Sequence, residues 1–537
     1  MGRGLEIREM YTAGEESSID DLVALAAADG DTAILVRALR ISWTTLVGRH
    51  GSQLRAIIDG LDPALWDADP WLIGAYAASW RSVGSTSRSA ALPYFDAAFS
   101  AMSDATPLAA RIGVELHYSA CLRSLGRLAD ALAAADRAAD LVAPDTTMPL
   151  AWRIRFGAKA ALQRGITLYH LGDYDSAETD LRRAAGLAES HMLLEERVEC
   201  FSALAMLEYS LGEFASASGY AARTRDAADG TGLLETRFGA AALVAELLMC
   251  VERNELDGAL ALTEPVGVAA ERSDWEPLAY YSRAAVSIIS ETYVEGLDLL
   301  RRGLQSYRQW TPPGSIVTVS EGLRATLLLR LGQTDTAWDI LGALVPTQHH
   351  ANCPGRFIAH LRFITGDSAG TLAALADCVA LGDAHSSRTL VDVHLLLAAA
   401  RYRLGEPAVA DLSFDRALLL ASHNGMRIPF RLVPQETMRT MLERATERPQ
   451  PDAVRDLFTD IDDWGTTHSS DDGVQLSDRE RDIVRALVRG STVGQIADEL
   501  YISVNTVKSH VKSVYRKLGV SSRQAAVKRA RELGHQL

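Results

Sequence analysis

The stretch LGDYDSAETDLRRAAGL, residues 171–187, begins with a Leu-Gly pair and continues with alanines and leucines at helical spacing. Similar stretches are LGRLADALAAADRAADL from Leu125 and LGEFASASGYAARTRDAA from Leu211, and weaker copies begin at Leu331 and Leu404. The glycines of these pairs are Gly126, Gly172, Gly212, Gly332 and Gly405. Their successive gaps fit one, one, three and two units of roughly 40 residues, so the sequence predicts a repeated structural unit.

Each copy predicts a hairpin of two helices, in which the glycine adopts the left-handed conformation that ends the first helix. Degenerate copies at 253–262 and 291–304 lie in the longest gap. Hairpins that bury their apolar faces only against neighbouring hairpins form an α-solenoid with a long concave surface. The phrase resembles the second half of a tetratricopeptide repeat, stretched to about 40 residues. We therefore expect an all-α fold with a tetratricopeptide-like array over 36–447, after an N-terminal segment (1–35). We also expect its aromatic residues to pack between helices, for instance Trp152, Tyr169, Tyr174 and Tyr209.

The composition of the chain excludes several classes of protein. No run of about 18 apolar residues is present, and the N-terminus has no apolar signal segment, so we expect no membrane association. The five cysteines are far apart along the chain and form no CxxC pair, which favours reduced cytoplasmic thiols over a disulfide framework. His349 and Cys353 have helical metal-ligand spacing, but Pro354 and Gly355 follow directly. We expect no metal, no cofactor and no enzymatic activity, because no phosphate loop or nucleophile–base pair is recognisable.

The array is followed by an acidic linker, residues 448–475, which begins near Pro449 and Pro451. Its first part, from Asp452, places Val454, Leu457, Phe458 and Ile461 on one helical face. We interpret this part as a short docking helix, with a partner-binding motif as the alternative. The polar stretch TTHSSDDG at 466–473 is typical of a flexible tether.

The charge distribution changes sharply at residue 476. Residues 476–537 contain 12 Lys and Arg against 6 Asp and Glu, whereas the whole chain contains 54 against 69 and has a net charge of −15. Positions 1–475 therefore contain 42 Lys and Arg against 63 Asp and Glu, which is a net charge of −21. As an average, −15 argues against nucleic acid as a partner, but a basic module on an acidic body is typical of a nucleic-acid binder with a separate sensing part.

Residues 476–537 predict four short helices with recognisable caps. Capping boxes pair Ser477 with Glu480 and Thr492 with Gln495; Ser503 caps the third helix, and Ser521 or Ser522 caps the fourth. Two helices joined by the short turn 501–503 predict a helix-turn-helix, with a small solvated bundle as the alternative. The polar face of the third helix, together with the start of the second, provides the candidate DNA-contacting residues, which are Asn505, Thr506, Lys508, Ser509, Lys512, Arg516 and Thr492.

The whole segment resembles the LuxR-type helix-turn-helix domain of bacterial transcription regulators. The resemblance rests on Leu476-Ser477-x-Arg479-Glu480, Ile496-Ala497, Ile502-Ser503, Thr506-Val507-Lys508-x-His510, Lys517-Leu518-x-Val520 and Arg523. It implies that Lys508, Ser509 and Lys512 face the bases. It also implies that the fourth helix forms a dimer contact through Val527 and Ala530, with packing inside the domain as the alternative. Val493-Gly494 departs from the family pattern and places a phosphate contact there in question.

The repeat region resembles that of the MalT-like subgroup of these regulators, which typically begins with a nucleotide-switched ATPase. This chain contains no Gly-Lys dipeptide, so we expect no Walker A loop and no ATPase. The resulting hypothesis is a cytoplasmic transcriptional regulator that binds an operator in double-stranded DNA as a homodimer. Its repeat domain would receive a ligand or protein signal, and RNA polymerase is a further candidate partner. A protein-interaction scaffold docked through its basic tail is the alternative.

Overall fold

The computed structural model describes residues 18–27, 32–80, 88–142, 148–306, 312–344, 353–382, 385–458, 478–500, 502–517, 522–523 and 525–527. These residues form helices, with no strand among them. None of the helices in these ranges is long and apolar enough to cross a bilayer.

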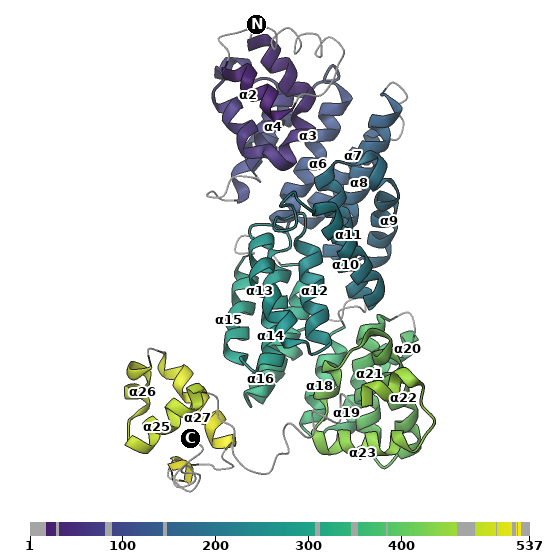
Figure 1. Ribbon diagram of the computed structural model, residues 1–537, viewed down its shortest axis with the longest axis vertical. Helices are drawn as coiled ribbons and strands as arrows, with labels where there is room; N and C mark the ends of the chain where they lie inside the picture. Colours follow the sequence, from purple (N-terminus) through teal and green to yellow (C-terminus); the bar gives the residue numbers. More distant parts are fainter. Residues whose placement is uncertain are drawn as a thin grey trace.

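The helices follow one another along the chain with short connections, and Figure 1 shows them stacked from the N-terminal end to α23. The first part comprises α2 Ile19–Ala27, α3 Thr32–Asp59, α4 Pro70–Ser79, α5 Leu92–Ala101, α6 Leu108–Ser124, α7 Leu128–Val142, α8 Leu150–Leu171, α9 Tyr174–His191, α10 Leu194–Leu211 and α11 Phe214–Ala228. The second part comprises α12 Ala240–Glu252, α13 Leu256–Ala270, α14 Glu276–Ser290, α15 Tyr293–Gln305, α16 Gly314–Arg330, α17 Thr334–Gly342, α18 Gly355–Ile364, α19 Ser368–Ala374, α20 Ala376–Leu381, α21 Ser387–Arg403, α22 Pro407–Asn424, the 3-10 helix η6 Ile428–Leu432 and α23 Gln435–Thr446.

The C-terminal domain consists of α25 Asp478–Arg489, α26 Val493–Glu499 and α27 Val504–Lys517, and it forms a separate body in Figure 1.

The turns between paired helices confirm the predicted repeat. All five glycines of the Leu-Gly pairs have positive φ, with values of 77°, 87°, 92°, 72° and 81° in chain order. In the two longer gaps, the equivalent turns carry Asn254 (φ 61°), Glu291 (φ 59°) and Gly366 (φ 89°). The fold is therefore a tetratricopeptide-like α-solenoid, with a left-handed turn residue in degenerate units as well as in the recognisable ones.

Aromatic side chains pack between the helices of the solenoid, as the sequence predicts. Tyr169, Tyr174 and Tyr209 belong to the main hydrophobic cluster, and Trp152 packs with Phe156 in a smaller one. Helix packing also crosses the predicted boundary near residue 36, because Ile19 and Leu22 of α2 are buried in the same cluster as Leu35, Leu39 and Trp43 of α3.

The solenoid closes on itself where an open concave surface was expected. The hydroxyl of Ser387 donates to the carbonyl of Gly212 (2.9 Å), and the amide of Asn424 donates to the same carbonyl (2.7 Å). Arg388 is 4% exposed and forms an ion pair with Glu252 at 3.2 Å. These contacts bring α21 and α22 against the end of α10 and α12, so side chains fill the inside of this superhelical turn.

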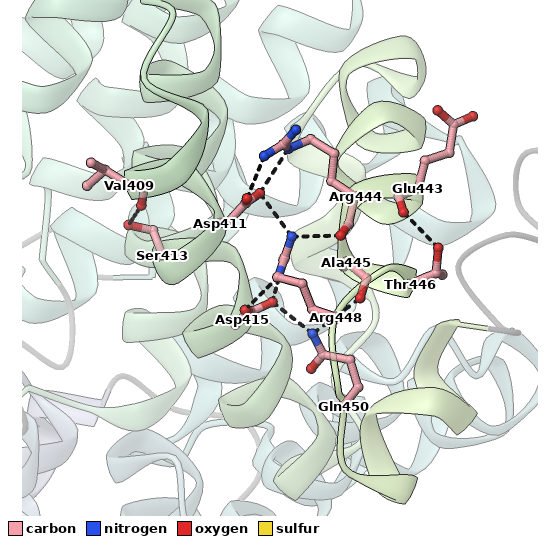
Figure 2. Close-up of polar contacts among 10 residues, drawn as sticks. All are labelled: Val409, Asp411, Ser413, Asp415, Glu443, Arg444, Ala445, Thr446, Arg448 and Gln450. Carbon is pink, nitrogen blue, oxygen red and sulfur yellow. Dashed lines mark hydrogen bonds and ion pairs between the residues drawn. The ribbon is translucent and has the colours of Figure 1, made fainter.

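Helix α23 closes the C-terminal end of the solenoid through ion pairs with α22. Figure 2 shows Arg444 pointing at Asp411 and Arg448 pointing at both Asp411 and Asp415, with N–O distances of 2.6, 3.1 and 2.6 Å. Two acids four residues apart on α22 thus face Arg444 of α23 and Arg448, which follows the end of α23.

The first part of the linker is helical, as expected of a docking helix. Val454 and Leu457 are buried in the main hydrophobic cluster of the solenoid, and Phe458 packs against it. Ile461 and the predicted tether at 466–473 lie outside the described residues, as does His349 of the candidate metal pair.

We expect alanine at the turn glycines to destabilise the solenoid in a graded way. Gly172→Ala introduces mainly the strain of positive φ, about 1–2 kcal/mol, because the added Cβ makes only ordinary contact with Ser315 at 3.8 Å. Gly212→Ala should cost more, since its Cβ would also meet the Ser387 hydroxyl and lie 2.6 Å from the Arg388 nitrogen.

The matched control is Gly186→Ala in the interior of α9, where an added Cβ meets nothing within 4 Å. This change should be neutral or stabilising. Urea midpoints from circular dichroism test the order, and equal midpoints for the Gly172 and Gly186 variants would contradict it.

Candidate DNA-binding site and solenoid cavity

The C-terminal domain is built on a small core that joins its three helices. Ile483, Ala486 and Leu487 of α25 pack with Ile496 and Ala497 of α26 and with Val507 of α27. Gly490 ends α25 with φ 93°. The core holds α26 and α27 in the arrangement of a helix-turn-helix, in which α27 is the recognition helix.

The predicted caps shape the N-terminal ends of α26 and α27. Thr492 and Gln495 form the capping box: the Thr492 N–H donates to Gln495 Oε1 (2.8 Å), and the Gln495 N–H donates to Thr492 Oγ1 (3.3 Å). The N–H of Thr506 donates to Ser503 Oγ at 3.1 Å. Ser522 caps the next turn by accepting from the Ala525 N–H, and Ser521 lies outside the described residues. Thr492 and Thr506 therefore take part in helix caps. A DNA contact by either residue, which stays a prediction, would have to form while these cap hydrogen bonds are kept.

The outer face of α27 presents cationic side chains to its surroundings. Lys508 and Lys512 are exposed and four residues apart, whereas Val507 and Val514 are buried on the opposite face. Asn505, Ser509 and Arg516 lie in α27, but their side chains are outside the described part of the chain. Two lysines on one face of a recognition helix are suited to phosphate oxygens and to the acceptor groups of guanine.

The ammonium group of Lys512 also contacts the solenoid. Its Nζ donates to the carbonyl of Gly332 at 3.2 Å, and Gly332 is the turn residue between α16 and α17. One predicted DNA-contacting side chain is therefore engaged by the repeat domain in this structure.

Two residues of the sequence motif hold the domain together. Glu480 is 4% exposed and accepts a hydrogen bond from Ser513 Oγ of α27 (2.8 Å); its predicted partner Ser477 lies outside the described residues. Arg523 donates to the carbonyl of Ser491 at 2.9 Å. Val527 packs against the three-helix core, and Ala530 lies outside the described residues, so a dimer contact by either residue stays a prediction.

A cavity of about 370 Å³ lies at the C-terminal end of the solenoid, and no sequence pattern indicated it. Its wall is largely apolar and includes Phe430, Met438 and Leu442. The charged side chains that line it among the described residues are three arginines and one glutamate, which are Arg330, Arg431, Arg439 and Glu291. The volume and the mixture of apolar and convergent polar groups are typical of small-molecule sites.

Hydrogen bonds to the backbone of η6 hold two of the cavity's polar side chains in place. Arg330 donates to the carbonyl of Arg431 (2.7 Å), and His360 Nε2 donates to the carbonyl of Leu432 (3.1 Å). Burial, with a further effect from Arg330, lowers the pKa of His360 to about 4. The imidazole is therefore neutral at pH 7, and the arginines leave the wall with an excess of positive charge.

Comparison with known proteins identifies the C-terminal domain. Residues 474–530 match the family described as bacterial regulatory proteins, luxR family. The C-terminal domain is of the LuxR type. The probable transcriptional regulatory protein NarL of Mycobacterium tuberculosis is 49% identical to the chain over 55 residues, which are 10% of this chain and 26% of NarL.

A second relative is the HTH-type transcriptional activator RamA of Corynebacterium glutamicum, which is 36% identical over 97 residues, 18% of this chain and 34% of RamA. The chain thus spans between a quarter and about a third of the length of these relatives.

Solved structures cover the solenoid at low similarity. A chain from the crystal structure of the APC/C hetero-tetramer Cut9-Hcn1 covers 96% of this chain and is itself covered to 99%, with 12% identity and a TM-score of 0.37. The TPR domain of P58(IPK) covers 67% of this chain and is covered to 99%, with 13% identity and a TM-score of 0.22. With scores this low, the description of the solenoid rests on its own helices and turns.

The buried histidines predict how stability depends on pH. His360 and His170 both have pKa values lowered to about 4 by burial, below the value of about 6.5 in an unfolded chain. The unfolded chain therefore binds more protons between these values, and the free energy of unfolding falls as the pH drops from 6.5 towards 4.

His360→Gln keeps a donor for the Leu432 carbonyl and should remove part of this loss, up to about 2 kcal/mol between pH 7 and pH 5. Urea unfolding at pH 7 and pH 5 measures it, and exposed His423→Gln is the control. An unchanged pH dependence in the His360 variant would contradict the assignment.

Proposed function

We propose that the chain is a sequence-specific DNA-binding transcription regulator that receives its signal through the solenoid. The observation that carries the proposal is the LuxR-type helix-turn-helix with Lys508 and Lys512 exposed on one face of α27. A recognition helix of this kind enters the major groove, where lysines reach base edges and phosphates. Binding as a homodimer, through the segment that contains Val527 and Ala530, and contact with RNA polymerase belong to the same proposal.

The solenoid opposes DNA binding in this proposal until a signal arrives. The contact between Lys512 and the Gly332 carbonyl supports such a restraint, because the face of α27 that carries Lys512 cannot lie in a major groove while it contacts the solenoid. The net charge of −21 on positions 1–475 attracts the basic domain and repels DNA. The polar stretch 466–473, predicted from its composition to be a tether, would let the domain leave the solenoid without unfolding.

The cavity bounded by α16, α18, η6 and α23 is the proposed site of the signal. Its apolar wall suits an aliphatic or aromatic body, and its arginines suit a carboxylate or phosphate on the same molecule. Since the ion pairs with α22 hold α23 in place, a ligand that moves α23 changes the end of the solenoid that leads into the linker.

We expect Lys512→Ala to weaken binding to the specific operator by about 1–3 kcal/mol if the ammonium contacts a base, with a similar loss for Lys508→Ala. The operator is first selected from a random DNA pool with the purified protein, and affinities are then titrated at fixed salt. Arg485→Ala is the control, because Arg485 is an exposed residue of α25 and its replacement also removes one positive charge.

Equal affinities for all these variants would remove the two lysines from the interface. DNA binding without salt dependence, or no binding by residues 476–537, would favour the scaffold alternative.

We expect Ile364→Trp to block the cavity, because Ile364 is 43% exposed and lines it. Thermal shifts with a panel of aromatic and fatty carboxylates should reveal a stabilising ligand for the unmodified chain that no longer stabilises this variant. Leu412→Trp is the control, since Leu412 is 71% exposed on α22 and outside the cavity. A ligand that stabilises both variants equally would contradict the site.

A further inference from the structure

Three side chains that can bind a metal meet inside the irregular part of the solenoid. Cys353 immediately precedes Pro354 and α18, Cys378 lies in α20, and His385 immediately precedes the cap of α21. Their ligand atoms all lie within 4.8 Å of one another, and the side chains are 5%, 1% and 4% exposed. The sequence did not indicate this group, because the two cysteines are far apart along the chain and the fold alone brings them together.

The backbone around the two sulfurs is shaped to approach them closely. The N–H of Gly355 donates to Cys353 Sγ at 3.3 Å. A Cβ at position 355 would lie 2.9 Å from the carbonyl oxygen of Ala374 and 3.2 Å from Cys353 Sγ, so glycine allows the close approach of the backbone to Cys353, whereas Cys378 Sγ at 3.6 Å would be in ordinary contact. A backbone N–H that donates to a sulfur stabilises the thiolate form, which is the form that binds metals.

The backbone at His385 is held in part by the closure of the solenoid. Its own N–H donates to the carbonyl of Gly382 at 3.0 Å, and the next residue, Ser386, donates through its hydroxyl to the carbonyl of Ser210 at 3.0 Å. The imidazole is thus carried on a turn that is fixed at both of its ends.

We propose that Cys353, Cys378 and His385 bind a zinc ion. Two thiolates and one imidazole are the donor set that Zn²⁺ prefers, and the two thiolates balance its charge. With Zn–S bonds of about 2.3 Å, two sulfurs on one tetrahedral zinc lie about 3.8 Å apart, whereas a disulfide requires about 2.05 Å. The observed Sγ–Sγ distance of 3.3 Å is closer to the zinc value. Among the described residues no other Cys, His, Asp or Glu joins the group, so these three side chains supply three of the four ligands of a tetrahedral zinc.

The zinc site stabilises the part of the solenoid with the least helix. Helices α18, α19 and α20 have 10, 7 and 6 residues, compared with 17 and 18 in the following pair, α21 and α22. A metal that joins the start of α18 to α20 and to the start of α21 replaces helix packing that this unit lacks. Since α18 also carries His360 and Ile364, the same ion steadies one wall of the cavity.

The test is the metal content of the full chain, purified under reducing conditions without chelator and measured by inductively coupled plasma mass spectrometry. We expect about one zinc per chain, and a lower thermal midpoint after its removal by a chelator. Cys353→Ser, Cys378→Ser and His385→Asn should each lose at least about tenfold in zinc affinity. Cys250→Ser, which changes a cysteine of α12 outside the group, is the matched control and should retain the metal.

Reconstitution with Co²⁺ separates binding from folding. The full chain and the Cys250 variant should show thiolate-to-cobalt charge-transfer absorption in the near ultraviolet, and the Cys353 variant should not. Circular dichroism shows whether the Cys353 variant is folded. A folded Cys353 variant that retains zinc and the cobalt band overturns the proposal. A purified chain with no bound metal, or three free thiols instead of five after denaturation without reductant, also overturns it, the latter in favour of a Cys353–Cys378 disulfide.

Discussion

From α6 to α22, each described pair of helices turns on one residue with positive φ, and the stacking of these repeats depends on that turn. In the left-handed region, the chain reverses direction while its N–H groups satisfy the last carbonyls of the first helix. Glycine adopts this conformation freely, as at Gly172 and Gly212, and asparagine tolerates it, as at Asn254, whereas Glu291 adopts it at a cost of about 1–2 kcal/mol. The degenerate units accept this cost because packing between neighbouring hairpins depends on the direction in which the second helix leaves the turn.

Closure of the solenoid then creates the sites that no single repeat contains. Contacts such as Ser387 to Gly212 and Arg388 to Glu252 join residues 175 and 136 positions apart. They place η6 and α23 over α16 and α18, which encloses the cavity, and they fix the turn that carries His385 beside the two thiols. Opening this turn would break the buried ion pair between Arg388 and Glu252. That would leave a charge without compensation inside the superhelical turn, so the ion pair favours the closed arrangement.

The C-terminal domain and the solenoid carry net charges of opposite sign. Its core is small, and Glu480 and Arg523 support the packing with hydrogen bonds between helices. The lysines remain outside, on a domain of positive charge joined to a body of negative charge. In the proposed function, this charge separation favours both DNA binding by the C-terminal domain and its restraint by the solenoid, and Lys512 contacts the solenoid at Gly332.

Local patterns in the sequence determined the helical hairpins, their turn residues, the caps of α26 and α27, and the LuxR-type domain, because each of these depends on residues within a few positions of one another. The same patterns distinguished Lys508 and Lys512 from the buried valines of α27. The cavity, the closure through Arg388 and the meeting of Cys353, Cys378 and His385 were decided by the tertiary structure alone. Each of them joins side chains from separate repeats or separate helices, and the rotation between successive hairpins that brings them together is the sum of many packing contacts, which no local sequence period encodes.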